Sequence, residues 1–344
     1  MLRLAINGFG RIGRSILRAF YERKLQDRAK IVAINDLASS EIITYLTKYD
    51  TTHGQFSYNV SNNCGNLKID DDIILLYQEP TPIKLPWSDL KIDLVFENTG
   101  IFVDRKSAED HLCAGAKKVL ISHPSTRDVD SIIVYGVNHY QLDWQKHSIV
   151  SSASCTSNCL VPVIDILDRY FSVDYGVVTT IHPMMNDQKV IDSMDSYRKN
   201  ISMLRLCRAA SNSIVPVKTN IARTTERIFP HLKGKLEANS IRVPTLNVTA
   251  LDLSIILKTK VNIANVNKVF LQESTERMRG ILDYNILPLV SCDFNNNPHS
   301  CIIDSTQTIV CNDNLLKLLL WCDNEWGFAN RMIDIFLQLE KKWG

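Results

Sequence analysis

Three glycines between an apolar run and a helical pattern constrain the fold of this chain more than any other feature. Residues 2–6 read LRLAI, which predicts a buried strand, and residues 14–25 read RSILRAFYERKL, which predicts a helix. The segment between them, INGFGRIGR, places Gly8, Gly10 and Gly13 in a GxGxxG spacing. Glycine at these positions permits a tight turn, close approach to a pyrophosphate and close packing of helix on strand. This combination predicts a dinucleotide-binding βαβ unit.

An acidic residue ends the next apolar run. Residues 30–36 read KIVAIND, so Asp36 follows Gly13 by 23 residues, close to the spacing of an acid that binds a ribose. A tight turn without a ligand is the alternative explanation of the glycines, and Asp36 argues against it. A carboxylate at this place would repel a 2′-phosphate, so the sequence favours NAD over NADP.

Further short apolar runs follow, separated by helical patterns such as SAEDHLCAGA at 107–116. Runs of this kind indicate parallel strands that are buried on both faces of a sheet. We therefore expect residues 1–153 to form a doubly wound parallel sheet of the Rossmann type, completed by a C-terminal helix at 325–344. The additional strands are expected at residues 93–100, 117–122 and 132–138.

The pattern changes at residues 148–160, where small polar residues lead into a helical pattern over 158–171 with Ser154 as its N-cap. Beyond this helix apolar and polar residues alternate, as they do in a sheet that is covered on one face. Residues 154–324 are therefore expected to form an α+β domain with a mixed, largely antiparallel sheet. Its strands are expected at 176–182, 240–257 and 287–294, and residues 183–216 are expected to form a long ordered loop.

Composition excludes several classes of protein. The chain is 45% hydrophobic and 22% charged with a formal net charge of +2, so nothing suggests a nucleic acid or a membrane as partner. No apolar run approaches the roughly 18 residues of a membrane-spanning helix, and the N-terminus lacks the apolar stretch of a signal peptide. The nine cysteines are odd in number and lack zinc-site spacing. We expect a cytoplasmic protein with reduced thiols and no metal.

One cysteine and one histidine suggest chemistry. Cys155 stands among small polar residues at a predicted helix start, where backbone amides stabilise a thiolate, and His182 ends a predicted strand. Taken alone, the first is explained by a buried inert thiol and the second by a structural histidine. Beside a dinucleotide site, the pair suggests oxidation of an aldehyde through a thioester.

Three arginines lie in or after the long loop: Arg205, Arg208 and Arg242. Arginine is the usual choice for bidentate binding of a phosphate because its guanidinium is planar and always charged. The alternative is a solvated surface or structural ion pairs, which is the usual role of arginines.

Five segments resemble the glyceraldehyde-3-phosphate dehydrogenase family, and they extend from the first predicted strand to the last helix. They are INGFGRIGR, KYDTTHG (48–54), SSASCTSNC (151–159), RVPT (242–245) and DNEWGFANRM (323–332). The resemblance implies an NAD-dependent dehydrogenase of phosphorylated aldoses, with a nucleophile at Cys155 and a general base at His182. It also implies a homotetramer in which the long loop helps to bind the NAD of a neighbouring subunit.

The resemblance also implies two sets of binding residues. Asn324 would hold the nicotinamide carboxamide, and the remaining cofactor residues would be Gly8, Phe9, Gly10, Arg11, Ile12, Gly13, Asn35, Asp36, Asn98, Thr99, Gly100 and Ser122. Contacts to substrate and phosphate anions would come from Ser154, Thr156, Arg205, Thr219, Asn220 and Arg242.

Several positions are more similar to the D-erythrose-4-phosphate dehydrogenase branch of the family than to its glycolytic branch. The glycolytic pattern after the catalytic histidine is HSYTNDQ, whose threonine binds a phosphate, whereas this chain reads HPMMNDQ with Met185 at that place. A thioether cannot donate a hydrogen bond to a phosphate. Cys322 and Phe328 stand where the glycolytic branch usually has tyrosines, and SHPS at 122–125 replaces SAPS.

Other positions depart from the erythrose pattern, including Asn220 in place of a lysine and one lost basic residue in LRLCRAA at 204–210. The resemblance implies oxidation of D-erythrose 4-phosphate to 4-phosphoerythronate, a step toward pyridoxal 5′-phosphate. The alternative is the phosphorylating glycolytic reaction. A remote alternative is a non-catalytic binding protein on the same fold, for instance one that holds RNA, for which a net charge of +2 gives no basic footprint.

Overall fold

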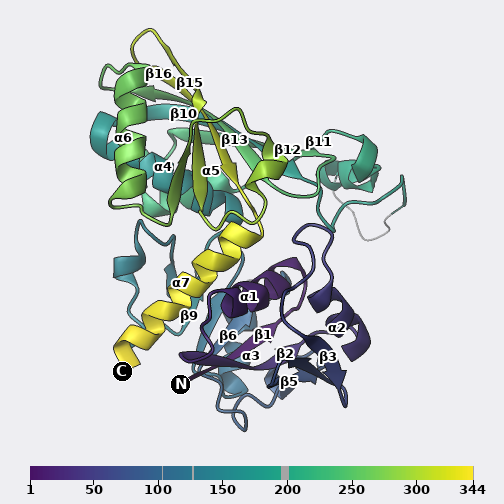
Figure 1. Ribbon diagram of the computed structural model, residues 1–344. Coiled ribbons are helices and arrows are strands. Elements are labelled where there is room, and N and C mark those ends of the chain that lie inside the picture. Colours follow the sequence, from purple (N-terminus) through teal and green to yellow (C-terminus); the bar gives the residue numbers. More distant parts are fainter. Residues whose placement is uncertain (103, 126–127, 195–200, 344) are drawn as a thin grey trace. The chain divides into compact units, whose positions relative to one another are not determined.

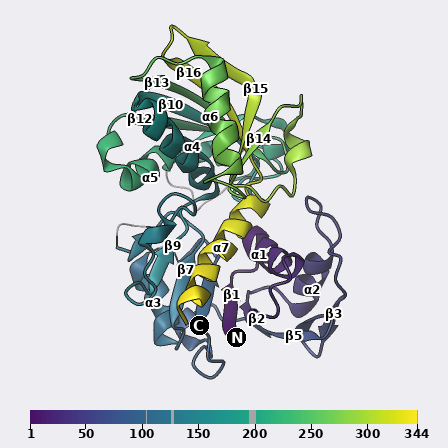
Figure 2. The ribbon, with the colours of Figure 1, turned by 60° about the vertical axis from the view of Figure 1, so that its left-hand side comes forward.

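The computed structural model describes residues 1–102, 104–125, 128–194 and 201–343, without the side chains of 201–203 and 340–343. The chain divides into two compact units, residues 1–154 with 328–344 and residues 155–327. Each unit contains one large sheet with helices packed on it (Figures 1 and 2).

The sheet of the first unit has nine strands in the order β3-β4-β5-β2-β1-β6-β7-β9-β8. Every pair from β5–β2 to β9–β8 is parallel, whereas β3, β4 and β5 pair in antiparallel fashion. The order reverses at β1, and ligands of doubly wound sheets bind at the carboxyl ends of the strands beside such a point. The strands are β1 (Leu2–Asn7), β2 (Ala29–Asn35), β3 (Val60–Asn63), β4 (Asn66–Ile69), β5 (Asp72–Tyr77), β6 (Leu94–Glu97), β7 (Lys118–Ile121), β8 (Ser131–Ile132) and β9 (Ile149–Ser151).

Two helices far apart in the sequence, α1 (Arg11–Glu22) and α7 (Trp326–Trp343), lie on the same face of this sheet (Figure 2). Arg23, just after α1, forms an ion pair with Asp334 of α7 at 2.8 Å. Phe336 of α7 packs edge-on against Phe96 of β6, with ring centroids 6.2 Å apart. The C-terminal helix is therefore part of the core of the first unit.

The opposite face of the same sheet carries its own apolar cluster. Val95 neighbours Phe96 on β6 and so points to the other face, where it packs with Ala5 and the fully buried Trp87. The helix α3 (Arg105–Cys113) covers β7 and β9 through Ala108. The remaining elements of this unit are α2 (Ser40–Lys48) and the short 3₁₀ helices η1 (Pro82–Lys84) and η2 (His139–Gln141).

The second unit has a seven-stranded mixed sheet in the order β11-β12-β10-β13-β16-β15-β14. The pairs β10–β12 and β14–β15 are parallel and the others antiparallel. Its helices are α4 (Cys155–Phe171), α5 (Ile221–Ile228) and α6 (Ile263–Thr275), with 3₁₀ helices η3 (Ile201–Cys207), η4 (Ala210–Asn212), η5 (Pro230–Leu232) and η6 (Ser291–Phe294). Its strands are β10 (Val173–Pro183), β11 (Val215–Val217), β12 (Leu236–Val243), β13 (Thr249–Leu257), β14 (Leu282–Asn285), β15 (Cys301–Cys311) and β16 (Leu315–Cys322).

The predicted fold class is confirmed: a doubly wound, mostly parallel sheet is followed by an α+β part with a mixed, largely antiparallel sheet. Three predicted strands are wrong in detail. Residues 133–138 form turns after β8, with Gly136 at φ +96°, and residues 287–294 contain η6 instead of a strand. The predicted strand at 240–257 is two strands, because Pro244 has no N–H for a ladder and Val248 adopts φ +68°.

The long loop predicted over 183–216 contains short elements. Lys189 and Ala209 form an isolated parallel bridge, and Arg208 forms an ion pair with Asp192 at 2.7 Å, so the two arms of the loop are tied together. Residues 195–200 of this segment lie outside the described residues.

The glycine turn offers a stability test. A Cβ added at Gly13 would lie 2.3 Å from the carbonyl oxygen of Gly8, whereas a Cβ at Gly10 would meet nothing within 4 Å. We expect Gly13→Ala to lower the free energy of unfolding by about 1–3 kcal/mol through overpacking. Gly10→Ala, the matched control, should leave it nearly unchanged. Thermal unfolding followed by circular dichroism without NAD measures both, and equal melting temperatures for the two variants would contradict this account.

Candidate active site

The glycine turn of the first unit leaves an open helix N-terminus. Gly8 adopts φ +85° and its N–H donates to the carbonyl of Asn35 at 2.9 Å, which fixes the turn at the ends of β1 and β2. Gly10 is the N-cap of α1 and supplies no side-chain acceptor. The first amides of α1 therefore face a space that a Cβ at Gly10 would partly fill, and such a cradle fits a pyrophosphate.

Two polar side chains beside the turn keep hydrogen-bonding capacity. Asp36 accepts from the backbone N–H of Phe9 at 2.7 Å and of Ala38 at 2.9 Å, one on each carboxylate oxygen. Each oxygen has a further lone pair, so the carboxylate can still accept from ribose hydroxyls. Asn98, after β6, has a buried Oδ1 that accepts no hydrogen bond within the described residues.

Other predicted cofactor residues gather at the same edge of the sheet. Thr99 and Gly100 follow β6, and the backbone of Thr99 would lie only 2.6 Å from a Cβ at Gly8. Ser122 follows β7, and its Oγ hydrogen-bonds the Nδ1 of His123 at 3.0 Å. The carboxyl ends of four neighbouring parallel strands thus bring together the first-unit residues predicted to bind NAD, and their donors and acceptors fit that cofactor.

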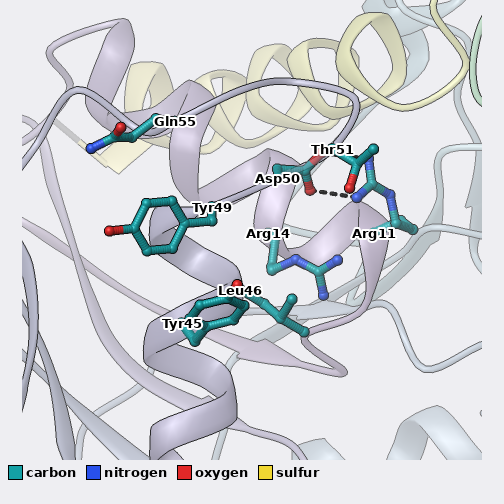
Figure 3. A pocket seen from close by; sticks show the side chains of 8 residues that line it. All are labelled: Arg11, Arg14, Tyr45, Leu46, Tyr49, Asp50, Thr51 and Gln55. Atoms are coloured by element: carbon teal, nitrogen blue, oxygen red, sulfur yellow. Dashed lines mark hydrogen bonds and ion pairs between the residues drawn. The ribbon is translucent and has the colours of Figure 1, made fainter.

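A pocket of about 310 Å³ opens beside the start of α1 (Figure 3). Arg11, a predicted cofactor residue, lines it and forms an ion pair with Asp50. Burial by itself would raise the pKa of Asp50, but Arg11 and the backbone amides of His53 and Thr52 lower the pKa to about 2. The other lining residues are Arg14, Tyr45, Leu46, Tyr49, Thr51 and Gln55.

In the second unit, Cys155 is the first residue of α4 and is partly exposed. Burial of the Cys155 thiol raises its pKa to about 12, and the neighbouring thiol of Cys322 contributes to this rise. The backbone N–H of Thr156 and the charge of Arg242 act in the opposite direction and favour the thiolate. Donors at the helix N-terminus therefore help ionisation as expected, but burial outweighs them.

His182, near the end of β10, is held as a neutral imidazole. Its Nδ1 lies 2.8 Å from the carbonyl oxygen of Pro183, and a carbonyl only accepts, so Nδ1 carries the hydrogen. Burial lowers the pKa of His182 to about 4, and the positive charge of Arg242 contributes to this. The Nε2 lone pair is consequently available to accept a proton at neutral pH.

Arg242 acts on both groups because of strand pairing. His182 and Arg242 are partners in the parallel register of β10 and β12. The Arg242 side chain is 13% exposed and donates from Nη1 to Asp187 at 3.3 Å and to Gln188 at 3.5 Å, while its Nε is buried without a hydrogen-bond partner in the described structure. An anion is the ligand that such a guanidinium favours.

The remaining predicted site residues differ in their local contacts. Asn324 accepts from the Thr249 hydroxyl at 3.2 Å, and Arg205 donates to the carbonyl of Pro216 at 3.5 Å. Thr219 accepts from the backbone N–H of Ile221 at 3.3 Å, and Asn220 is the N-cap of α5 without a side-chain cap hydrogen bond. Ser154 directly precedes Cys155 at the end of the first unit, and Ile12 is a half-buried residue of α1.

Sequence reasoning missed three groups that the structure places beside these sites. They are Glu97, which binds Thr99, Asp50, which pairs with Arg11, and Cys322, whose thiol lies near that of Cys155. A carboxylate that directly follows the apolar run DLVF was a readable signal for Glu97, whereas the other two meet their partners only through the tertiary fold.

Within the described residues, no helix has both the length and the apolar character needed to cross a bilayer. No group of three or more His, Cys, Asp or Glu side chains in that part of the chain is arranged to hold a metal ion. All nine cysteines are free thiols.

Comparison with known families agrees with this geometry. The family model described as the NAD binding domain of glyceraldehyde 3-phosphate dehydrogenase matches residues 2–105, which contain the glycine turn and Asp36. The model of the C-terminal domain of the same family matches residues 154–324, which contain Cys155 and His182. The chain therefore belongs to the glyceraldehyde 3-phosphate dehydrogenase family of NAD-dependent oxidoreductases, and its first unit contains the NAD-binding domain.

Proposed function

We propose that this protein oxidises D-erythrose 4-phosphate to 4-phosphoerythronate with NAD, through a thioester on Cys155, within a catalytic domain formed by residues 154–324. The observation that carries the choice of reaction is Met185. Its side chain is 46% exposed three residues after His182, and it presents a thioether where the glycolytic pattern has a phosphate-binding hydroxyl.

The residues of the second unit account for the first chemical steps. The sulfur of Cys155 forms a bond to the aldehyde carbon while the thiol proton passes to the carbonyl oxygen, which gives a hemithioacetal. As hydride leaves that adduct, Nε2 of His182 accepts the proton of its hydroxyl group. Bound NAD supplies the hydride acceptor that converts the hemithioacetal to a thioester. The backbone N–H of Cys155 and the imidazole of His182 would hold the developing oxyanion, and donors placed in this way supply several kcal/mol.

The second half of the reaction depends on which nucleophile reaches the thioester. Attack by inorganic phosphate requires a bound second anion, and Met185 provides no donor for one. Water needs no such site, and its attack releases the carboxylic acid and regenerates the Cys155 thiol. The missing donor therefore supports hydrolysis over phosphorolysis, with the phosphorylating glycolytic reaction as the alternative.

Arg242 is proposed to bind the phosphate of the substrate, since its buried Nε has no partner within the described chain. Ser154, Thr156, Arg205, Thr219 and Asn220 are proposed as further anion contacts, as the family resemblance implies. The substrate assignment would place the enzyme in pyridoxal 5′-phosphate biosynthesis, and the free thiols suit a cytoplasmic location.

A homotetramer is part of the proposal. In the first unit, the rings of Tyr45 and Tyr49 lie 5.2 Å apart at the pocket of Figure 3, and 63% and 48% of their respective surfaces are exposed. In the second unit, Tyr175 and Val177 of β10 are also exposed. Exposed apolar groups that are gathered in this way favour association, and a second copy of this chain is the partner we propose.

Arg242 generates a prediction for the reactivity of Cys155. Removing its charge in Arg242→Met should raise the pKa of the thiol, because a nearby positive charge favours the thiolate. At a fixed pH below that pKa, Cys155 should then react more slowly with iodoacetamide, and the pH profile of alkylation should move upward by about one unit. Arg242→Lys keeps the charge and is the control; a profile that moves equally in both variants would argue against an electrostatic effect.

The substrate prediction is tested by NADH formation with erythrose 4-phosphate and with glyceraldehyde 3-phosphate, each with and without inorganic phosphate. We expect faster turnover on the four-carbon sugar and no requirement for phosphate. Met185→Thr should create a phosphate-stimulated rate by adding a donor hydroxyl, whereas Met185→Leu should not. Cys155→Ser gives the background rate. A strict phosphate requirement with a three-carbon preference would establish the glycolytic reaction instead.

The tetramer prediction is tested by sedimentation. The wild-type protein should sediment as four chains, and Tyr45→Asp should shift it to smaller species because a charge would be buried in the contact. Tyr140→Asp is a matched control, since Tyr140 is 73% exposed in η2 and does not line the pocket. A monomeric wild-type protein would refute the proposed assembly.

A further inference from the structure

A buried carboxylate lies under the cofactor edge of the first unit. Glu97, the last residue of β6, is 0% exposed and accepts hydrogen bonds on both oxygens. Oε1 accepts from the backbone N–H and the hydroxyl of Thr99, at 2.8 and 2.5 Å, and Oε2 accepts from the Asn7 amide at 2.6 Å. A carboxylate withdrawn from water is tolerated only with such partners.

The remaining partner of Glu97 is a histidine whose hydrogen position is fixed by a tryptophan. The indole Nε1 of Trp87 lies 2.9 Å from Nδ1 of His111, and an indole nitrogen can only donate. Nδ1 is therefore an acceptor, and the ring hydrogen sits on Nε2, 2.9 Å from Oε2 of Glu97. His111 and Trp87 are both 0% exposed, so the chain from indole to imidazole to carboxylate is closed to solvent.

This network reaches the residues that shape the cofactor turn. Thr99, held by Glu97, has the backbone nitrogen that would lie closest to a Cβ on Gly8, at 2.6 Å. Asn7, which also bonds Glu97, accepts from Asn35 at 2.7 Å. The Asn35 amide in turn bonds both the N–H and the carbonyl of Glu79, at 2.8 and 2.9 Å. One carboxylate thus connects the ends of β1, β2 and β6 and the segment after β5.

We propose that Glu97 is a positioning residue for NAD, and that Trp87 and His111 orient its carboxylate. Glu97 holds the Asn98–Gly100 segment against the glycine turn, so the cofactor meets a surface that is already in place. Preorganised contacts bind more tightly because little ordering remains to be done on binding. This inference rests on the NAD-binding domain and is independent of which aldehyde the enzyme oxidises.

The test compares Glu97, at the carboxyl end of β6, with Asp93, a second buried acid that directly precedes the same strand. Asp93, just before β6 at its amino end, is 8% exposed, accepts from the Arg3 backbone at 2.8 Å and pairs with Lys117 at 2.8 Å. Glu97→Gln keeps the size of the side chain but replaces one carboxylate oxygen with an amide NH₂. That group is itself a donor, so it cannot accept from the donors that surround Glu97. We expect Glu97→Gln to raise the Kd for NAD by roughly tenfold in isothermal titration calorimetry, and Asp93→Asn to leave it unchanged.

A second variant separates positioning from general stability. Trp87→Phe removes the donor to His111 Nδ1 together with part of a buried ring. It should weaken NAD binding by a smaller factor, with a KM for NAD that rises while kcat at saturating NAD stays close to wild type. The double variant Glu97→Gln/Trp87→Phe should bind NAD about as weakly as Glu97→Gln alone, because the two residues act through one carboxylate. Thermal unfolding without NAD records any common loss of stability.

Two results would overturn the proposal: unchanged NAD affinity in Glu97→Gln, or an equal loss of affinity in Asp93→Asn. If Glu97→Gln does not fold, Trp87→Phe against Asp93→Asn decides the question in the same way. Normal NAD binding by the wild-type protein without turnover of either aldehyde phosphate would contradict the proposed function while leaving this inference intact.

Discussion

The cofactor edge of the first unit depends on one close backbone approach. Gly8 is pressed between the backbone of Thr99 and that of Gly13, with no room for a Cβ on either glycine. The approach brings the start of α1 down onto the ends of β1 and β6, so the first amides of the helix lie at the same edge that Asp36 borders. That contact therefore places amides suited to an anion and a carboxylate suited to ribose hydroxyls at one edge of the sheet.

The second unit sets proton positions by a different means. Burial disfavours both charged forms, raising the pKa of the Cys155 thiol and lowering that of the His182 imidazole. The pair therefore rests as a thiol and a neutral base, and the backbone carbonyl of Pro183 leaves Nε2 as the acceptor. Arg242 favours the thiolate and disfavours the imidazolium, so its charge promotes nucleophile formation at the expense of the base. A phosphate bound to Arg242 would reduce both effects.

Much of the first unit could be predicted from sequence because its determinants are local. The glycine spacing, the strand before it and Asp36 specify the turn, and apolar runs identify strands that are buried on both faces. The strand predicted over 132–138 is wrong beyond Ile132 because the apolar residues there occupy turns. In them the Asn138 side chain accepts from the N–H of Val134 and donates to the carbonyl of Ile132. The strand predicted over 287–294 is wrong because proline and small polar residues within an apolar run allow a 3₁₀ turn as easily as a strand.

The site in the second unit was only partly accessible for a related reason. Cys155 and His182 could be singled out because a helix start and a strand end are local features. The contacts of Arg242 could not, since they follow from the parallel pairing of β10 with β12, which brings together residues sixty positions apart. Glu97 is intermediate, because its place at a strand end can be read from the sequence but its partners cannot. His111 bonds it from α3, and Trp87, in the segment after η1, bonds His111.

A buried carboxylate near the proposed place of a pyrophosphate raises the question of repulsion between like charges. Two unit charges several ångströms apart in a protein interior interact by a few kcal/mol at an effective dielectric constant of about 20. Glu97 offsets this cost with four donors, two on each oxygen, whose positive ends face the carboxylate. The same donors come from Asn7, Thr99 and His111, so the groups that compensate the charge are the groups that the charge holds in place. The same hydrogen bonds therefore compensate the charge of Glu97 and position the turn. A neutral side chain at this position would lose both effects.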